Sequence, residues 1–163
     1  MHTDSYNAAM QMKPEQIVVG IGAALGIVLM VIGVWVLMHV VPDSTIMDTT
    51  ANRLAYALGA NVIAILPFFI MIITVGNKRF LSRAIDPTRH AENLAIEIDG
   101  KVTDNTLQQN FVFFVVSLAL SLVVPFIYLN VVWAAAIWFV IARILFWVGY
   151  RIHPLYRAPG MSG

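Results

Sequence analysis

The sequence has no cysteine and few charged residues. Among its 163 residues there is no Cys, and Asp, Glu, Lys and Arg together make up 12% of the chain, against about 25% in an average soluble domain. The lack of cysteine excludes disulfides, thiolate catalysis and Cys-ligated metal sites. The scarcity of charge excludes an ordinary water-soluble domain and a disordered chain. The net charge of +1 gives no indication of a nucleic-acid partner, and none is expected.

Hydrophobic residues are abundant instead, at 60% of the chain, and they are concentrated in long uncharged runs. A helix needs about 20 apolar residues to cross the hydrocarbon core of a bilayer, and four runs approach or exceed that length. We therefore predict an all-α integral membrane protein, a single membrane domain of residues 1–163 with four transmembrane helices in a left-handed bundle. The predicted spans are residues 17–41, 54–76 (interrupted by Pro67), 105–124 and 131–152.

The basic residues of the connecting segments predict the orientation of the spans. The polar loop 77–104 contains Lys78, Arg79, Arg83, Arg89 and Lys101. Residues 42–53, on the other side, contain a single basic residue, Arg53. Because basic loops stay on the cytoplasmic side, we expect the loop 77–104 and both termini to be cytoplasmic. Within this loop, residues 88–98 are expected to form a short amphipathic surface helix, followed by a turn at Asp99-Gly100.

Arg143 is the strongest functional signal, because it lies inside the fourth predicted span. An arginine at the centre of a membrane helix costs roughly 2.5–3.5 kcal/mol on insertion scales, so its partner matters. One interpretation is an anion-binding group in a cleft between helices. The other is a structural pair with a backbone carbonyl or an amide side chain. Both remain open from the sequence.

Other polar residues lie near Arg143 in the predicted bundle or in its own helix. Asn105 and Gln108 open the third span and share a helix face. They could contact lipid headgroups at an interfacial helix end or a neighbouring helix. Arg143, Tyr150 and Arg157 are spaced by seven and would share a face, unless Pro154 ends the helix first. The histidines are isolated at spacings that do not suggest a metal site, so no metal is expected.

Two segments of the sequence resemble the MAPEG family, the membrane-associated proteins in eicosanoid and glutathione metabolism. Residues 101–111, KVTDNTLQQNF, are similar to the helix opening Arg-x-x-x-Asn-x-x-Glu of that family and close to its bacterial form, Asn-Thr-Leu-Glu-Gln. Residues 142–150, ARILFWVGY, are similar to the family pattern Ala-Arg-x-x-Tyr-x-x-Gly-Tyr. The resemblance covers residues 54–160 and includes the basic cluster 77–79, which matches the cluster ending the family's first helix.

The resemblance implies a homotrimer of four-helix protomers in a bacterial inner membrane, in contact with membrane lipids. It implies glutathione or a related anionic thiol as co-substrate, bound in a cytoplasmic-side cleft between subunits. The thiol would be transferred to lipophilic small-molecule electrophiles, or would reduce lipid hydroperoxides. By position, Arg157 and Tyr150 are the expected catalytic residues that stabilise the thiolate. The expected thiol-binding residues are Arg79, Lys101, Asn105, Gln108 and Arg143.

The sequence also departs from the family pattern, and these departures favour a second function. Gln108 stands where a glutamate is usual, and Phe146 replaces a tyrosine that often contacts glutathione. The helix predicted at 17–41 precedes the matching region and has no counterpart there. The alternative is a non-catalytic helical scaffold or a lipid-binding subunit of a larger complex with other membrane subunits.

Overall fold

The computed structural model describes residues 14–42, 49–82, 84, 86, 92–153 and 160, and all regular secondary structure within them is helical. This confirms the all-α prediction. The helices are α2 (Pro14–Val40), α3 (Thr50–Ala64), α4 (Leu66–Phe80), α5 (Leu94–Val123), the short 3-10 helix η3 (Phe126–Tyr128) and α6 (Val131–Ile152).

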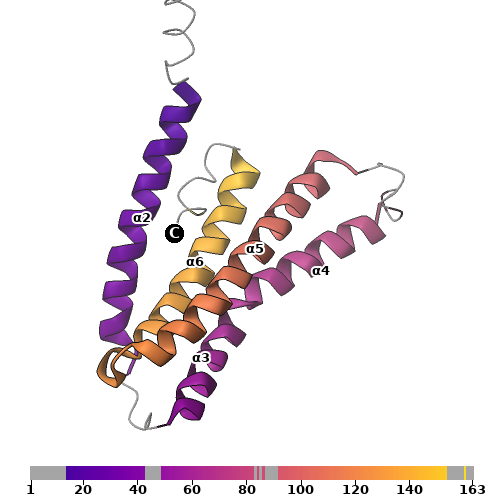
Figure 1. Cartoon of the computed structure of the whole chain (residues 1–163). Coiled ribbons are helices and arrows are strands. Elements are labelled where there is room, and N and C mark those ends of the chain that lie inside the picture. The colour runs from indigo at the N-terminus through magenta and orange to yellow at the C-terminus, as the bar shows by residue number, and fades with distance from the viewer. Residues whose placement is uncertain are drawn as a thin grey trace, which may run out of the picture.

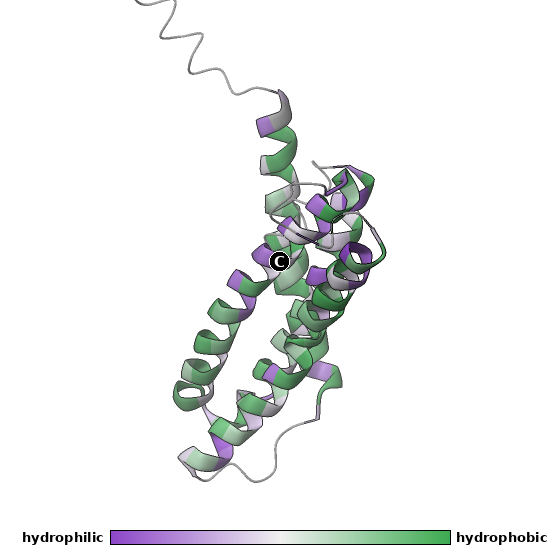
Figure 2. Ribbon diagram, turned by 90° about the vertical axis from the view of Figure 1, so that its right-hand side faces the viewer, coloured by the Kyte–Doolittle hydropathy of each residue, from purple (hydrophilic) through white to green (hydrophobic). Residues whose placement is uncertain are grey.

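Four helical segments are long and apolar enough to cross a membrane, as expected of an integral membrane protein. The first is α2, the second combines α3 with α4, the third is α5, and the fourth combines η3 with α6. Successive spans run in opposite directions (Figure 1). One end of the bundle, here called the polar end, therefore contains the start of α2, the end of α4, the start of α5 and the end of α6. Hydrophilic residues are most frequent toward this end (Figure 2).

The second span is broken where the sequence contains Pro67. Helix α3 ends at Ala64 and α4 begins at Leu66, so Pro67 lies in the first turn of α4. Proline has no N–H to donate there and is tolerated at this position. The two helices meet at a clear angle (Figure 1). The interruption expected at Pro67 is thus present.

The third span begins earlier than the sequence predicted. Helix α5 begins at Leu94 rather than near Asn105, and its N-cap Asn93 accepts a hydrogen bond of 3.0 Å from the N–H of Ile96. The expected turn at Asp99-Gly100 is therefore wrong, because the helix continues through both residues. Of the expected surface helix 88–98, residues 88–91 lie outside the described residues. Residues 94–98 form the start of α5 rather than a separate helix.

Small residues allow α3 to approach α6 closely. Ala57, Ala60 and Ala64 of α3 are buried against the α6 residues Val132 and Ala136. Such small side chains are typical of contacts between membrane helices, where close backbone approach replaces the hydrophobic driving force. The packed interface fixes the position of α6 and of its only intramembrane arginine.

Helix α5 is polar on its buried face and apolar on its exposed face. Its buried polar residues are spaced by seven or four, so that they lie along one stripe: Asp99, Thr106, Asn110, Ser117 and Ser121. Its exposed side chains include Leu107, Phe111, Val115 and Leu122. This is the arrangement expected of a helix whose surroundings are apolar.

Helix α2 packs against α6 through Gly33. A Cβ atom at Gly33 would lie 2.1 Å from the Trp138 ring, whereas a Cβ at Gly20 of the same helix would meet nothing within 4 Å. At the C-terminal end of α2, the Asn130 side-chain amide donates to the carbonyls of Met38 (2.9 Å) and Val41 (3.5 Å). The additional helix is thus joined to the bundle by one close steric contact and one polar contact.

We expect Gly33→Ala to lower the melting temperature of the detergent-purified chain. The new methyl group would overpack the contact with Trp138, at a cost of roughly 1–3 kcal/mol. The matched control is Gly20→Ala, which should leave the melting temperature unchanged or raise it, since alanine favours a helix over glycine by about 1 kcal/mol. Equal effects of the two substitutions would contradict the packing described for α2.

Candidate functional site

Arg143 is fully buried between α5 and α6, and its guanidinium is held by two acceptors. Its Nη1 donates to Oδ1 of Asn105 at 3.1 Å, and its Nη2 donates to the carbonyl of Gly160 at 2.5 Å. Its Nε has no hydrogen-bond partner within the part of the chain that the structure describes. The Nε–H of Arg143 is therefore a donor that its described surroundings do not use.

Two aromatic rings flank the guanidinium. The Cζ atom of Arg143 lies 5.3 Å from the centroid of the Phe139 ring and 5.2 Å from that of Phe146. These residues precede and follow Arg143 by four and three positions, so all three share a face of α6. Contacts of a cation with aromatic faces are favourable, and they gain strength when the cation is desolvated. Phe146 therefore has a structural role beside the arginine.

Gly160 reaches Arg143 because it has no side chain. A Cβ atom there would lie 2.4 Å from the backbone nitrogen of Phe146 and 2.8 Å from the carbonyl oxygen of Ala142. Only a glycine can approach the backbone of α6 this closely. Its carbonyl can therefore accept the hydrogen bond from Nη2 of Arg143.

The structure joins Asn105 to Arg143 but disperses the other predicted site residues. Tyr150 is half-buried, and its ring lies edge-on to Phe146 with centroids 5.9 Å apart. Gln108 is exposed on the outer side of α5. Arg157, the predicted thiolate-stabilising residue, lies outside the described residues. The described side chains among them do not line one closed pocket.

The two remaining predicted residues form ion pairs with glutamates. Nζ of Lys101 lies 2.6 Å from the carboxylate of Glu97, one turn earlier on the exposed side of α5. Nη2 of Arg79 lies 2.6 Å from the carboxylate of Glu92. Arg79 also lines a groove of about 280 Å³ between α4 and α5, together with Thr103. These two cations are therefore near the polar end and partly exposed, whereas Arg143 is fully buried.

Asp99 is a buried functional candidate that the sequence analysis missed. Its side chain is 1% exposed and accepts hydrogen bonds from three residues of two other helices. Lys78 of α4 donates through Nζ to Oδ2 at 2.6 Å, and Trp147 of α6 donates through Nε1 to Oδ1 at 2.8 Å. Arg151 donates through Nε to Oδ1 at 2.8 Å and through Nη2 to Oδ2 at 2.7 Å. The spacing of Asp99 from Thr106 and Asn110 could have revealed it as part of the buried stripe of α5.

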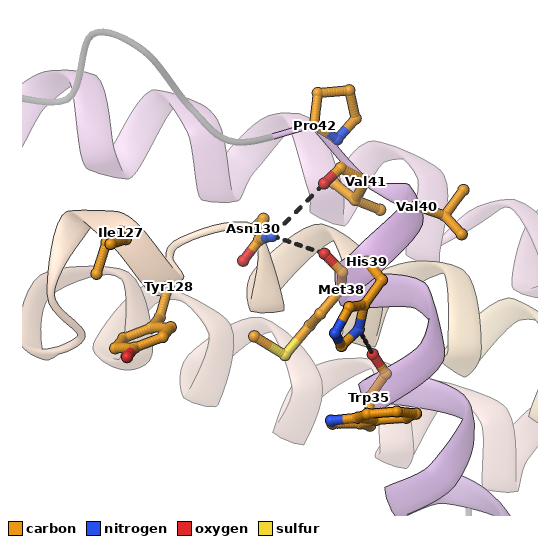
Figure 3. A pocket seen from close by; sticks show the side chains of 9 residues that line it. All are labelled: Trp35, Met38, His39, Val40, Val41, Pro42, Ile127, Tyr128 and Asn130. Atoms are coloured by element: carbon orange, nitrogen blue, oxygen red, sulfur yellow. Dashed lines mark hydrogen bonds between the residues drawn. The ribbon is translucent and has the colours of Figure 1, made fainter.

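A larger cavity lies at the opposite end of the bundle, away from every predicted site residue that the structure describes. It has a volume of about 590 Å³ and is lined by the end of α2 and by η3 (Figure 3). His39 donates through Nδ1 to the carbonyl of Trp35 at 2.8 Å, which leaves Nε2 as an acceptor in the neutral ring. No lysine or arginine is among its described lining residues. An anionic ligand would therefore find no cationic partner among those residues.

Comparisons with known proteins do not identify the chain. No family model, curated protein or solved structure matches it. The described residues contain no group of three or more His, Asp or Glu side chains that could hold a metal ion. The resemblance to the MAPEG family therefore depends on the two sequence segments alone.

Replacing Asp99 by asparagine should destabilise the polar end. The change would leave Lys78 and Arg151 close together without their shared counter-charge, and we expect a loss of roughly 1–3 kcal/mol of folding stability. Thermal unfolding in detergent measures the effect. Glu97→Gln is the matched control, since it breaks an exposed i,i+4 pair on the same helix at a cost of about 0.5 kcal/mol or less. An Asp99→Asn protein as stable as the control would show that the buried carboxylate is dispensable.

Proposed function

We propose that the chain is a MAPEG-like membrane protein that binds glutathione or a related anionic thiol near Arg143. The observation that supports this proposal is the hydrogen bond between Arg143 and Asn105. Each residue belongs to one of the two segments that carry the resemblance, and the fold brings these segments together. Arginine is suited to pair with the carboxylates of such a peptide thiol. The unused Nε–H of Arg143 is a further donor for such a ligand.

The remaining residues have roles in the proposed site that depend on assembly. Lys101 and Gln108 are exposed on α5, one turn before and one turn after the half-buried Asn105, where a second subunit of a homotrimer would complete the cleft. Arg79 would contribute a further cation at the polar end. In this proposal the polar end and both termini face the cytoplasm of a bacterium, and the membrane is its inner membrane. The protomers form left-handed bundles of the MAPEG type.

The proposed reaction is the transfer of the thiol to a lipophilic electrophile. Tyr150 and Arg157 would stabilise the thiolate after the thiol proton leaves to solvent. The thiolate sulfur then forms a bond to the electrophilic carbon, and the leaving group departs with its bonding electrons. In the related reduction of a lipid hydroperoxide, the thiolate sulfur attacks the terminal peroxide oxygen and the O–O bond breaks, which gives a sulfenic acid and the lipid alcohol. A second thiol molecule then converts the sulfenic acid into a disulfide and water. The apolar substrate would enter from the bilayer.

Calorimetric titration of the purified chain with glutathione tests the binding proposal. Replacing Arg143 by glutamine should weaken binding by roughly 10- to 100-fold, since a charged hydrogen bond contributes about 1.5–3 kcal/mol. The matched control is Arg53→Gln at the other end of the bundle. Arg53 donates to the carbonyls of Ser121 (3.2 Å) and Val124 (2.8 Å), so this change removes a structural arginine remote from the site. No heat of binding, or equal weakening by both changes, would refute the proposal.

A non-catalytic scaffold or lipid-binding subunit is the second candidate function. The observation that favours it is that both terminal nitrogens of Arg143 are already bound inside the protomer, to Asn105 and Gly160. An arginine whose terminal nitrogens are bound in this way can have a purely structural role. The departures from the family pattern at Gln108 and Phe146 also favour this second function.

Turnover of a model electrophile separates the two functions. We expect the purified chain to conjugate glutathione to 1-chloro-2,4-dinitrobenzene, with the rate falling roughly 10²- to 10⁴-fold in Arg157→Ala if that residue activates the thiol. Lys13→Ala, which removes a basic residue at the other terminus, is the control. An absence of turnover, together with co-purification of another membrane protein, would establish the scaffold function instead.

A further inference from the structure

Two cations from different helices lie close together at the polar end. Nζ of Lys78 is 2.6 Å and Nη2 of Arg151 is 2.7 Å from the same oxygen, Oδ2 of Asp99. The two nitrogens are therefore no more than about 5.3 Å apart, the sum of these distances. The three side chains together carry one net positive charge. The Lys78 and Arg151 side chains are 36% and 42% exposed, whereas Asp99 is 1% exposed.

The helix lengths place this charge cluster at the level of the lipid headgroups. Helix α5 has 30 residues and is about 45 Å long at 1.5 Å per residue, compared with a hydrocarbon core of about 30 Å. Its excess length extends beyond the core, and Asp99 lies in its second turn. Lys78 and Arg151 are in the last turns of α4 and α6. All three helices thus place the cluster near one surface of the membrane.

The cluster is held in position before any ligand arrives. Asp99 binds both the Nε and Nη2 atoms of Arg151, in a bidentate pair that fixes the plane of the guanidinium. The guanidinium also lies over the Trp147 ring, 4.5 Å from its centroid. Less side-chain freedom is lost on binding when donors are already oriented.

We propose that Lys78 and Arg151 bind the phosphate of an anionic membrane phospholipid. A lysine has three donors and an arginine five, so their contacts with Asp99 leave N–H groups for a second acceptor. The oxygens of one phosphate can reach two cations at this separation. A zwitterionic lipid carries an ammonium next to its phosphate, which the net positive charge of the cluster repels. Exposed apolar side chains on the membrane side of Arg151, Ile144 and Val148, share its face of α6 and can contact the acyl chains.

This lipid site is independent of the proposed thiol site. None of Lys78, Asp99 and Arg151 has a role in thiol binding or transfer, and Arg143 has none in lipid binding. Failure of the glutathione experiments would leave the lipid experiment unchanged, and the reverse also holds.

Native mass spectrometry of the full chain in detergent tests the site. The probes are phosphatidylglycerol and phosphatidylcholine with identical acyl chains. We expect phosphatidylglycerol to bind more tightly, and Lys78→Gln to weaken its binding about fivefold, the effect of one basic residue at a lipid surface. Lys101→Gln is the matched control, because Lys101 is paired with Glu97 in an exposed i,i+4 pair on α5 rather than with a buried carboxylate that two cations share. It should change binding less than about twofold on the same scale.

A second measurement needs no substitution. If the site exists, phosphatidylglycerol raises the melting temperature of the unmodified chain more than an equal concentration of phosphatidylcholine, since only a ligand of the folded state stabilises it. Equal retention of the two lipids, equal effects of Lys78→Gln and Lys101→Gln, or equal melting temperatures with both lipids would each overturn the proposal.

Discussion

The buried carboxylate of Asp99 connects three helices at the polar end of the bundle. It accepts hydrogen bonds from Lys78 of α4 and from Trp147 and Arg151 of α6, while its own backbone belongs to α5. In a bilayer the lipid tails are as apolar as leucine, so hydrophobic burial does not select one helix arrangement over another. A buried charge does favour one helix arrangement, because the charge is costly in every arrangement that separates it from its partners. The positions of the helix ends at this surface follow from that constraint.

Similar polar contacts join other neighbouring helices farther along the bundle. The Asn61 amide of α3 donates to Oγ of Ser117 in α5 at 2.7 Å, and Asn130 at the start of α6 donates to the carbonyl of Met38 in α2. Arg143 of α6 binds Asn105 of α5 in the same manner. Close packing of alanines between α3 and α6 then fills the space between these contacts. Arg143 is therefore part of the network that holds the bundle together.

The sequence predicted four long apolar helices because their signal is local. Long uncharged runs specify helices in an apolar solvent, and Pro67 marks its own interruption without reference to any other part of the chain. The start of α5 was harder, since Asp99-Gly100 favours a turn when read alone. What keeps this pair helical is the set of partners of Asp99, and these lie 21 residues before it and 48 and 52 residues after it. Contacts across such separations depend on how helices pair, which hydropathy does not encode. The joining of Asn105 to Arg143, 38 residues apart, belongs to the same class.

The contacts of Arg143 also define what an anionic ligand would have to replace. The Gly160 carbonyl is a neutral acceptor, and a carboxylate in its place would form a charge-assisted bond that is roughly twice as strong. Asn105 could remain bound to Nη1 during this exchange, so the guanidinium would keep its orientation. The ligand would lose part of this gain, because its carboxylate must give up its hydration to enter a site with no exposed arginine surface. The displaced Gly160 carbonyl must in turn be rehydrated or paired elsewhere. Affinity at this site therefore depends on the difference between one charged and one neutral hydrogen bond, less the cost of moving Gly160, rather than on the full attraction of a free arginine.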